Sequence, residues 1–486
     1  MAILLQRAVV NTKYERNVFV AGGCIRDTIL GERPSDYDLL VSRPNEPLAL
    51  AQHLHSIGLS TKPQQFKRRG VVAVHIGHMP LEIAQVSTQD QSRKLECEVD
   101  RIHYLQNDAL RRDFTINSLY CGIDDLEVLD PTGLGRQDLN IRIIRSVTDP
   151  CLCFKDDPLR MFRAIRLAIC LNAQIEDNTW GAILNKGSSI KLVARERVKE
   201  ELTKILTNDK WTDGFILLKK SGLLHYVSPI MDDCITDLGV NTLSERFKMA
   251  SNHKSLELDS MKLKVTLLAA YLFEMTIRQA KYSLSQDQTL QAIYQDILSC
   301  FNVKQKDMVR VMNIVAYFIY LKDRLGTEFQ LDTFELINAA ICLKDDTLIL
   351  EALLKSTDIM NQEKNSKRLF ATRLEQLHRC FKKLSNHKLP VTGTDLISFF
   401  PGIPKKTIGC IKNIALMIWL NSEQISKNDL INRLRDITDD CKFECSACTC
   451  YESNDLTSNS WEQSNERIQR LISNHTNPCF NKEHRI

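Results

Sequence analysis

The chain has 486 residues, of which 43% are hydrophobic and 26% charged, and its 64 basic and 60 acidic side chains leave a formal net charge of +4. This composition is ordinary for a globular protein of several domains, and it excludes a strong overall positive field, so a nucleic acid would need local basic patches. No run of about 18 apolar residues occurs, so we expect no transmembrane helix. The sixteen cysteines follow no regular pairing pattern and no signal peptide precedes them, which favours reduced thiols in a cytoplasmic protein, with a mitochondrial protein as the alternative.

The first part of the chain, residues 18 to 147, alternates strand-like and helical runs. Strand-like length and composition occur in five runs, at 18–21, 37–42, 71–76, 80–87 and 126–130. The last of these leads into the turn Pro131-Thr132-Gly133, and the other runs are also bounded by turn residues. We therefore predict one small domain with a single sheet over residues 1–150.

A glycine pair follows the first of these strands. Gly22-Gly23 separates the apolar run at 18–21 from a helical segment that carries Arg26 and Asp27. A turn without Cβ atoms lets backbone N–H groups and a helix N-terminus come close to a phosphate chain. The pair is therefore a candidate triphosphate-binding turn, and an ordinary glycine turn is the alternative.

Two aspartates mark the next predicted strand. Asp36 and Asp38 are two residues apart, so on a strand both side chains point to the same face. Two carboxylates in one small site repel each other unless a cation neutralises them, and oxygen ligands suit Mg²⁺ or Mn²⁺, which also bind substrate phosphates. The pair predicts a metal site that handles phosphates, with solvated turn residues as the alternative.

A basic segment closes the predicted sheet domain. Residues 110–120 hold Arg111, Arg112, Asp113 and Asn117 within one or two helical turns. Adjacent guanidinium groups offer planar forks for phosphate oxygens, and an asparagine amide can hold a ribose hydroxyl. We expect this segment to contact a nucleotide; a solvated basic turn is the alternative.

Helical periodicity dominates after Asp149-Pro150. One apolar stripe is formed by Leu159, Met161, Phe162, Ile165 and Ala168, with the arginines at 160, 163 and 166 elsewhere on the helix. Further helices are predicted at 195–206, 213–227, 261–275, 308–325, 334–343 and 427–437. We divide this part into a neck (151–210), a body (211–325), a tail (326–440) and a polar, cysteine-rich segment (441–486) whose composition predicts disorder.

An acidic and a basic residue lie at the expected start of the first neck helix. Asp157 and Arg160 are three residues apart, which places them on one helical face. A carboxylate accepts from an exocyclic amine and a guanidinium donates to ring acceptors, so the pair fits the edge that cytosine and adenine share. Uracil and guanine would leave buried groups unpaired, at about 1–3 kcal/mol each. A surface ion pair or an acidic helix cap is the alternative.

These motifs together resemble those of class II tRNA nucleotidyltransferases, the CCA-adding enzymes. The matching segments are Gly22–Asp27, Asp36–Asp38, Arg111–Asn117, Asp156–Arg160 and residues 196–202, in the family's order and spacing, and residues 389–409 resemble its tail segment. The family belongs to the polymerase-β-like nucleotidyltransferase superfamily, which includes bacterial-type poly(A) polymerases. The resemblance implies an α+β fold, with a small mixed-sheet nucleotidyltransferase head followed by an all-helical neck, body and tail.

The resemblance also implies an activity: template-independent addition of CCA to the 3′ end of tRNA from CTP and ATP, with release of pyrophosphate. Its metal ligands would be Asp36 and Asp38, which would hold two Mg²⁺ (or Mn²⁺) ions as the catalytic pair. Its nucleotide-binding residues would be Gly22, Gly23, Arg26, Arg112, Asp113 and Asn117, together with Asp157 and Arg160, which would select the base. Glu196 and Arg197 would brace the neck.

Two departures from the family pattern leave alternatives open. Asp156 stands where the family usually has Glu, and the segment between Val86 and Leu110 lacks the common Arg-Arg-Pro sequence of the loop associated with switching from C to A addition. CC-only or A-only addition, or a bacterial-type poly(A) polymerase, therefore remain alternatives. A catalytically silent RNA-binding protein of the same fold is another, and the intact aspartate pair argues against it.

Two further sets of residues carry weaker expectations. Lysines in the predicted tail could contact tRNA phosphates, although surface lysines also serve solubility: Lys405, Lys406, Lys412 and Lys427. The clustered thiols of Cys441, Cys445, Cys448 and Cys450 could bind zinc, but their spacing is tighter than that of a usual closed site, and a disordered tail is the favoured alternative.

Overall fold

The computed structural model describes residues 1–42, 46–66, 70–86, 98–251, 260–278, 286–325, 349–350, 379–380, 382–383, 388–401, 405–422 and 425–440. The chain divides into two compact units. One consists of Met1–Val240 with Ser299–Asn302, and the other of Asn241–Leu298 with Val303–Ile486. The finer division into head, neck, body and tail stays a prediction.

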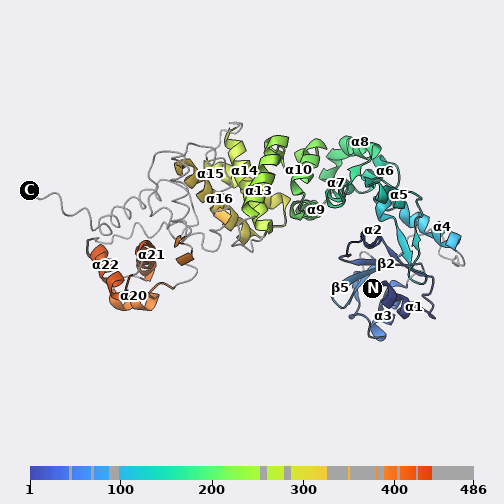
Figure 1. The fold of residues 1–486 in the computed structure, drawn as a ribbon, viewed down its shortest axis with the longest axis horizontal. Coiled ribbons are helices and arrows are strands. Elements are labelled where there is room, and N and C mark those ends of the chain that lie inside the picture. Colours follow the sequence, from blue (N-terminus) through green and yellow to red (C-terminus); the bar gives the residue numbers. More distant parts are fainter. Residues whose placement is uncertain are drawn as a thin grey trace, which may run out of the picture. The chain divides into compact units, whose positions relative to one another are not determined.

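The first unit begins with a mixed sheet (Figure 1). Its strands are β1 (Val18–Ala21), β2 (Tyr37–Val41), β3 (Gln64–Phe66), β4 (Val71–Ile76), β5 (Met79–Gln85), β6 (Tyr120–Gly122) and β7 (Val128–Leu129), in the order β3-β4-β5-β2-β1-β6-β7. Only β2 and β5 pair in parallel, and the other neighbours are antiparallel. The mixed sheet predicted from the sequence is confirmed, with β3 and β6 as additional strands.

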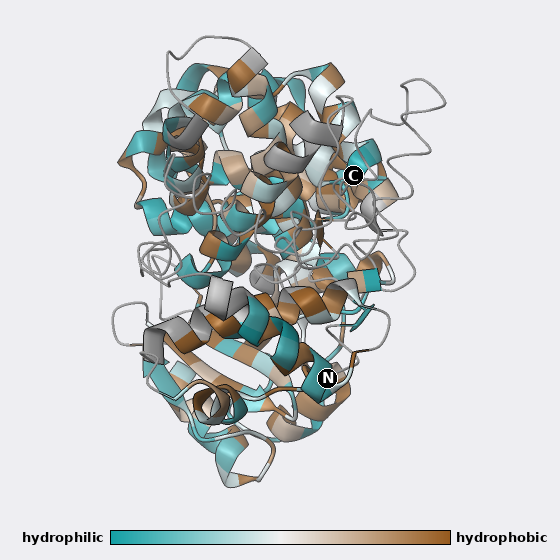
Figure 2. Ribbon diagram, turned by 90° about the vertical axis from the view of Figure 1, so that its left-hand side faces the viewer, coloured by the Kyte–Doolittle hydropathy of each residue, from teal (hydrophilic) through white to brown (hydrophobic). Residues whose placement is uncertain are grey.

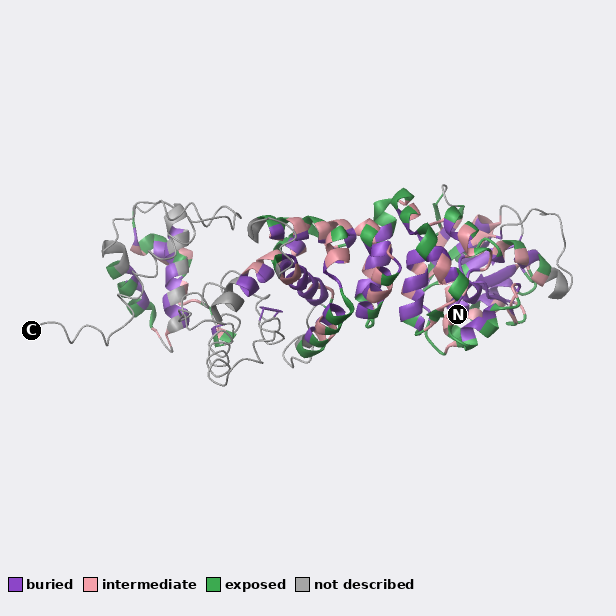
Figure 3. Cartoon of the chain, turned by 90° about the horizontal axis from the view of Figure 1, so that it is seen from above, coloured by how far each residue is buried: buried purple, intermediate pink, exposed green. Residues whose placement is uncertain are grey.

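Helices cover both faces of this sheet, which explains why β1 is apolar along its whole length. Phe19 and Leu40 belong to a buried cluster that includes Leu105 of α4 (Glu98–Ala109). Side chains alternate along a strand, so Val20 and Leu39 point to the opposite face. On that opposite face, α3 (Pro47–Ser56) packs on β4 and β5. α1 (Ala2–Val9) lies next to α3. The central strands are coloured as buried in Figure 3.

Short helices complete the first unit. They are α2 (Gly23–Ile29), α5 (Gly135–Asn140), α6 (Pro150–Asp156), α7 (Arg160–Leu171), α8 (Asp177–Lys186), α9 (Arg195–Thr207), α10 (Trp211–Lys220), α11 (Leu223–Val227) and α12 (Pro229–Cys234), with 3₁₀ turns at Thr115–Asn117 and Gly187–Leu192. The predicted apolar stripe of α7 is buried. The single helix expected over 213–227 is instead two helices, because Gly222 adopts the left-handed conformation with φ +72° and ends the first.

One pair of short strands interrupts the helical region. β8 (Ile143–Ile144) pairs in parallel with β9 (Gln174–Ile175), and the sequence analysis missed both. The neck is therefore helical apart from β9. This pairing ties the last part of the predicted head to the chain that follows α7, so the sheet domain and the first neck helices form one folded unit.

The described residues of the second unit form helices joined by turns and short irregular segments, without a strand. Its helices are α13 (Asp237–Ser251, which starts in the first unit), α14 (Ser260–Arg278), α15 (Gln286–Cys300, which ends in the first unit), α16 (Gln305–Leu325), α20 (Gly393–Phe399), α21 (Lys405–Asn421) and α22 (Lys427–Asp440). Figure 2 shows hydrophilic and hydrophobic residues mixed along the helices, as amphipathic packing requires. Within the described ranges, no helix is long and apolar enough to cross a membrane. The predicted helix at 334–343 and the cysteine cluster at 441–450 lie outside the described residues.

Candidate active site

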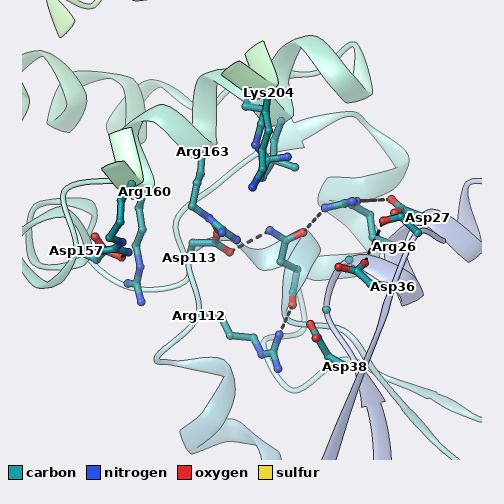
Figure 4. A pocket seen from close by; sticks show the side chains of 17 residues that line it. Arg26, Asp27, Asp36, Asp38, Arg112, Asp113, Asp157, Arg160, Arg163 and Lys204 are labelled. Atoms are coloured by element: carbon teal, nitrogen blue, oxygen red, sulfur yellow. Dashed lines mark hydrogen bonds and ion pairs between the residues drawn. The ribbon is translucent and has the colours of Figure 1, made fainter. Parts of the chain in front are cut away.

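One pocket of about 670 Å³ in the first unit gathers most of the residues singled out from the sequence (Figure 4). Eleven of its lining residues were predicted: Gly22, Gly23, Arg26, Asp36, Asp38, Arg112, Asp113, Asn117, Asp157, Arg160 and Arg197. The remaining lining residues are Asp27, Ser35, Arg163, Arg166, Leu167 and Lys204. The pocket thus lies between the ends of the central strands β1 and β2, the 110–120 segment and the helices α7 and α9.

The glycine turn lies where β1 passes into α2. Gly22 has φ +79°, a conformation that other residues rarely adopt. A Cβ atom at this position would lie 3.0 Å from Nη1 of Arg112 and 3.5 Å from Oδ2 of Asp38. Glycine is therefore needed twice, for its backbone and for the close approach of a cation and a carboxylate to the turn.

The two aspartates lie together at the same end of the pocket. Asp36 immediately precedes β2 and Asp38 lies on it, so the prediction that both belong to the strand is wrong by one residue. The pKa of Asp38 is raised to about 6, chiefly by burial in the pocket; Arg112 opposes the shift, and the negative charge of Asp36 adds to it. A carboxylate in this position is stabilised by a cation, which is the property expected of a metal ligand.

A third carboxylate near this pair escaped the sequence analysis. In the parallel register of β2 and β5, Glu82 lies opposite Asp38, and its negative charge also raises the pKa of that residue. Across the described ranges, no group of three or more His, Cys, Asp or Glu side chains has the geometry to hold a metal ion. The candidate metal site therefore rests on the two aspartates.

A chain of hydrogen bonds runs from α2 to α7 along the pocket. Nη1 of Arg26 donates to Oδ1 of Asn117 at 2.6 Å, and Nδ2 of Asn117 donates to Oδ1 of Asp113 at 3.0 Å. Nε of Arg163 donates to Oδ2 of Asp113 at 2.7 Å. Burial alone would raise the pKa of Asp113, but the charge of Arg163 and the hydrogen bonds outweigh it, so the pKa is lowered and the group stays ionised.

This chain changes what two predicted nucleotide contacts can do. Asp113 is buried and engaged by Arg163 and Asn117, so it orients its neighbours more than it faces the pocket. The amide oxygen of Asn117 is occupied by Arg26, which leaves its second N–H hydrogen for a ligand.

The expected base-selecting pair has a different local structure from the one predicted. Asp157 lies outside a helix, with φ −143° and ψ 99°, and α7 begins only at Arg160, so the two residues do not share a helical turn. Oδ2 of Asp157 accepts from Nη2 of Arg197 at 2.8 Å, while Arg160 donates to Sγ of Cys153 and to the carbonyl of Arg111. Each is thus held by its own partners, and both still line the pocket.

The two residues expected to brace the neck behave differently. Arg197 of α9 contacts Asp157, as described above, whereas Glu196 is exposed on the first turn of the helix. Of the residues described, Glu196 is not among those that line the pocket.

Several charged residues of the pocket were missed by the sequence analysis. Arg166 of α7 donates to Oε2 of the buried Glu201 of α9 at 2.6 Å, and Lys204 lies 3.3 Å from Oε1 of the same residue. Arg163 and Arg166 follow Arg160 at intervals of three, which places all three near one side of the helix. This three-residue spacing of arginines, away from the apolar stripe of α7, was the sequence signal that could have identified Arg163 and Arg166 as pocket residues.

The predicted RNA-contacting lysines lie in the second unit. Lys412 is exposed on α21, and Lys405 and Lys406 begin that helix, with side chains outside the described part. Lys427 forms an ion pair of 2.7 Å with Asp395, so its charge is already engaged within the protein.

Two parts of the chain match known families. Residues 18–145 match the family described as "Poly A polymerase head domain", and residues 172–235 match "Probable RNA and SrmB- binding site of polymerase A". Together these matches cover the strands β1 to β7 and the pocket helices α2 and α9, whereas Asp157 and α7 lie between the two matched segments.

Curated relatives agree with these families. A CCA-adding enzyme of Lactococcus lactis is 30% identical over 46% of this chain and 56% of its own length. A CC-adding tRNA nucleotidyltransferase of Halalkalibacterium halodurans is 32% identical over 43% and 49%, and poly(A) polymerase I of Salmonella typhi is 26% identical over 56% and 60%. The chain thus spans about half the length of the curated relatives it matches.

Solved structures share the fold over most of the chain. A CCA-adding enzyme in complex with ATP superposes with a TM-score of 0.63 at 17% identity, covering 90% of this chain and 94% of the other. The Bacillus stearothermophilus CCA-adding enzyme with CTP gives 0.61 at 20% identity, covering 90% and 98%. At such identities the likeness establishes the fold.

Proposed function

We propose that this chain, parts of which are similar to CCA-adding enzymes and poly(A) polymerases, adds CCA to the 3′ end of tRNA without a nucleic-acid template. In this reaction the 3′-hydroxyl attacks the α-phosphate of CTP or ATP, and pyrophosphate leaves. Two relatives at 30% identity or more are named for CCA and CC addition, which supports tRNA as the acceptor.

A single observation supports the proposal: one pocket is lined both by the carboxylates proposed to hold the metal ions and by the pair proposed to select the base. The glycine turn follows β1, Asp36 and Asp38 lie at the start of β2, and Asp157 and Arg160 lie where α6 ends and α7 begins. Seven cationic side chains line the same space, which suits a triphosphate: Arg26, Arg112, Arg160, Arg163, Arg166, Arg197 and Lys204.

Nucleotidyltransferases of this family use divalent metal ions, and we propose Mg²⁺, with Mn²⁺ as a substitute. Burial and the neighbouring charge of Asp36 raise the pKa of Asp38, so a cation bound between the two carboxylates would stabilise their ionised form, and the residues present fit such an ion. When bound, the metal ions would activate the 3′-hydroxyl and stabilise the leaving pyrophosphate. Since the chain supplies two carboxylates, phosphate oxygens and water would complete the ligands.

The other pocket residues would bind and orient the nucleotide. We propose that Gly22, Gly23 and Arg26 support the triphosphate, and that Arg112 and Asn117 contact its sugar and phosphates, with Asp113 holding Asn117 in place. This division follows the hydrogen bonds of Asn117, which leave one of its side-chain N–H hydrogens for the ligand.

Base selection would come from Asp157 and Arg160. One oxygen of Asp157 accepts from Arg197 and the other from the backbone N–H of Leu159. A carboxylate has about four lone-pair sites, so it can also accept from the exocyclic amine of cytosine or adenine. Arg197 would then hold the carboxylate in its base-selecting position, and we propose Glu196 only as a helix-start residue of the same motif.

Further parts of the proposal lie beyond the pocket. We propose that the helices after residue 240 bind tRNA, with Lys405, Lys406 and Lys412 among the phosphate contacts. We also propose the five-part division of the chain at residues 150, 210, 325 and 440, and a cytoplasmic location with mitochondria as the alternative.

Poly(A) synthesis is the second candidate, since poly(A) polymerase I relatives match 56% of this chain. The test is incubation with labelled CTP or ATP, Mg²⁺ and tRNA that ends before, within or after its CCA sequence. We expect addition to stop at CCA. Long A-tails would favour the poly(A) alternative, addition of only CC or only A would indicate a partial enzyme, and no extension would refute the proposed activity.

A further inference from the structure

Arg112 forms hydrogen bonds with two residues that do not line the pocket. Nε of Arg112 donates to Oδ2 of Asp108 at 3.1 Å and to the hydroxyl of Tyr120 at 2.9 Å. The Tyr120 hydroxyl in turn donates to the same Oδ2 atom at 2.8 Å. The three groups form a closed triangle, because each contacts the other two.

The environment of this triangle keeps the hydroxyl of Tyr120 and the guanidinium of Arg112 protonated, as the hydrogen bonds require. Burial raises the pKa of Tyr120 far above its usual range, so the hydroxyl keeps its proton and donates it to the carboxylate. Although burial by itself would lower the pKa of Arg112, its electrostatic interactions and hydrogen bonds with Tyr120 and Asp108 outweigh burial and raise the pKa, so the guanidinium stays charged. The guanidinium carbon also lies 5.0 Å from the Tyr120 ring centre.

Asp108 and Tyr120 are both fixed to the sheet that carries the catalytic carboxylates. Tyr120 pairs with Ala21 across β6 and β1, and Ala21 pairs with Asp38 across β1 and β2. Directly paired residues point to the same face, so these three side chains stand in one row across the sheet. Asp108 lies on the last turn of α4, which packs on that face through Leu105 and the neighbouring Ala109.

The triangle determines which edge of the guanidinium faces the pocket. Of its five N–H groups, the one on Nε is used by Asp108 and Tyr120, and one on Nη1 donates to the carbonyl of Asn117 at 3.3 Å. Within the described residues, the other N–H groups on Nη1 and Nη2 have no hydrogen-bond partner. Nη1 lies beside the Gly22 turn, and Figure 4 shows Arg112 next to Asp38.

We propose that Asp108 and Tyr120 are positioning residues that lock Arg112 so that its outer edge holds a phosphate or sugar oxygen of the incoming nucleotide beside Gly22 and Asp38. The inference rests on the proposed nucleotide-transfer function and assigns a role to two residues outside the pocket. Arg112 would contact a part that CTP and ATP share, so both nucleotides depend on the triangle equally. A purely structural ion pair at the end of α4 would show no such dependence.

The test measures nucleotide binding and transfer in three variants of the full chain. Asp108→Asn removes the charge, Tyr120→Phe keeps the buried ring and removes the hydroxyl, and Asp232→Asn is the matched control. Asp232 has a side chain 17% exposed, against 13% for Asp108, and pairs with Lys219 at 2.9 Å in the same unit away from the pocket. The readouts are calorimetric Kd values for CTP and ATP with Mg²⁺, and KM values for each nucleotide and for tRNA.

We expect the Kd and KM for both nucleotides to rise about tenfold in Asp108→Asn and about fivefold in Tyr120→Phe, as loss of charged and neutral hydrogen bonds implies. The KM for tRNA and all values of Asp232→Asn should stay within about twofold of the unmodified protein. In an Arg112→Ala background, Asp108→Asn should have no additional effect, because it acts through Arg112.

Three outcomes would overturn the inference: nucleotide constants unchanged in both variants, losses that add to that of Arg112→Ala, or a loss confined to one nucleotide. Tyr120→Phe keeps the test valid if Asp108→Asn fails to fold. If the unmodified protein binds CTP and ATP but extends no tRNA, the proposed activity fails while the binding data still test the triangle. A protein that binds neither nucleotide would overturn both.

Discussion

Replacing Asp38 by Asn should remove activity and stabilise the metal-free protein. The pKa of Asp38 is about 6 in the folded chain, against 3.8 for an unperturbed aspartate, because burial and the charge of Asp36 disfavour ionisation. Ionised Asp38 therefore destabilises the fold unless a cation is bound. An amide of the same shape removes that charge, and with it the ability to hold a metal ion.

The size of the stabilisation by Asp38→Asn follows from the pKa shift of Asp38. Two pKa units correspond to about 3 kcal/mol. The walls of the pocket remove part of the hydration of Asp38, but its side chain remains exposed to the water in the pocket. Solvent screening therefore reduces the stabilisation, and we expect about 1 kcal/mol. For a domain of this size that is a rise in Tm of about 2–4 °C.

The raised pKa of Asp38 also determines in which direction the stability of the protein changes with pH. Between about pH 4 and pH 6 the folded state holds a proton on Asp38 that the unfolded state has lost, so the stability of the unmodified protein falls as the pH rises through this window. The stabilisation by Asp38→Asn should therefore be absent near pH 4 and complete above about pH 6.5.

The stability assay is thermal unfolding in EDTA from pH 4 to pH 8. In separate samples with Mg²⁺ and without EDTA, tRNA extension and tRNA binding are measured. Asp27→Asn is the control, since Asp27 lines the same pocket but is paired with Arg26 at 2.6 Å, and its removal should give no stabilisation. A lower or unchanged Tm for Asp38→Asn at pH 7.5 would refute the reasoning about the electrostatics. Loss of tRNA binding would count against a role limited to the metal site.

Three other substitutions test the geometry of the pocket. Gly22→Ala should cost about 1–3 kcal/mol in urea unfolding and most of the activity, because φ is +79° there, whereas Gly181→Ala, in open space on a helix, should be neutral or stabilising. Arg197→Ala should reduce the preference for CTP over UTP about tenfold by freeing Asp157; an unchanged ratio of kcat/KM values would contradict this. Asp113→Asn should cost about 3 kcal/mol and flatten the stability curve below pH 4, since the lowered pKa of this carboxyl makes its contribution disappear as the pH falls.

Local motifs were predicted well from the sequence because their geometry is local. The glycine turn and the aspartate pair depend on φ at one position and on strand alternation over three residues, and both occur in the pocket. The one-residue error in the start of β2 does not affect them. The break at Gly222 was missed because the apolar pattern runs through it, although a glycine at that point allowed the left-handed turn.

Partners distant in the chain could not be predicted. Asp157 pairs with Arg197, forty residues away, rather than sharing a helical turn with Arg160. Asp113 pairs with Arg163 across fifty residues. Such pairings depend on how α7 and α9 pack against the sheet domain, and a spacing rule within one helix carries no information about that packing.

The sequence by itself predicted a metal and phosphate site, from two carboxylates two residues apart and a glycine turn, because each signal depends on residue type and short-range geometry. Together with the Asp-Arg motif and the resemblance to a known family, this led us to propose nucleotide transfer. Only the tertiary structure decided how these groups are held. Strand register places Tyr120, Ala21 and Asp38 in one row, and α4 brings Asp108 to Arg112. Register and helix packing arise from the burial of the whole core, so the orientation of the arginine beside the candidate metal site is a property of the fold.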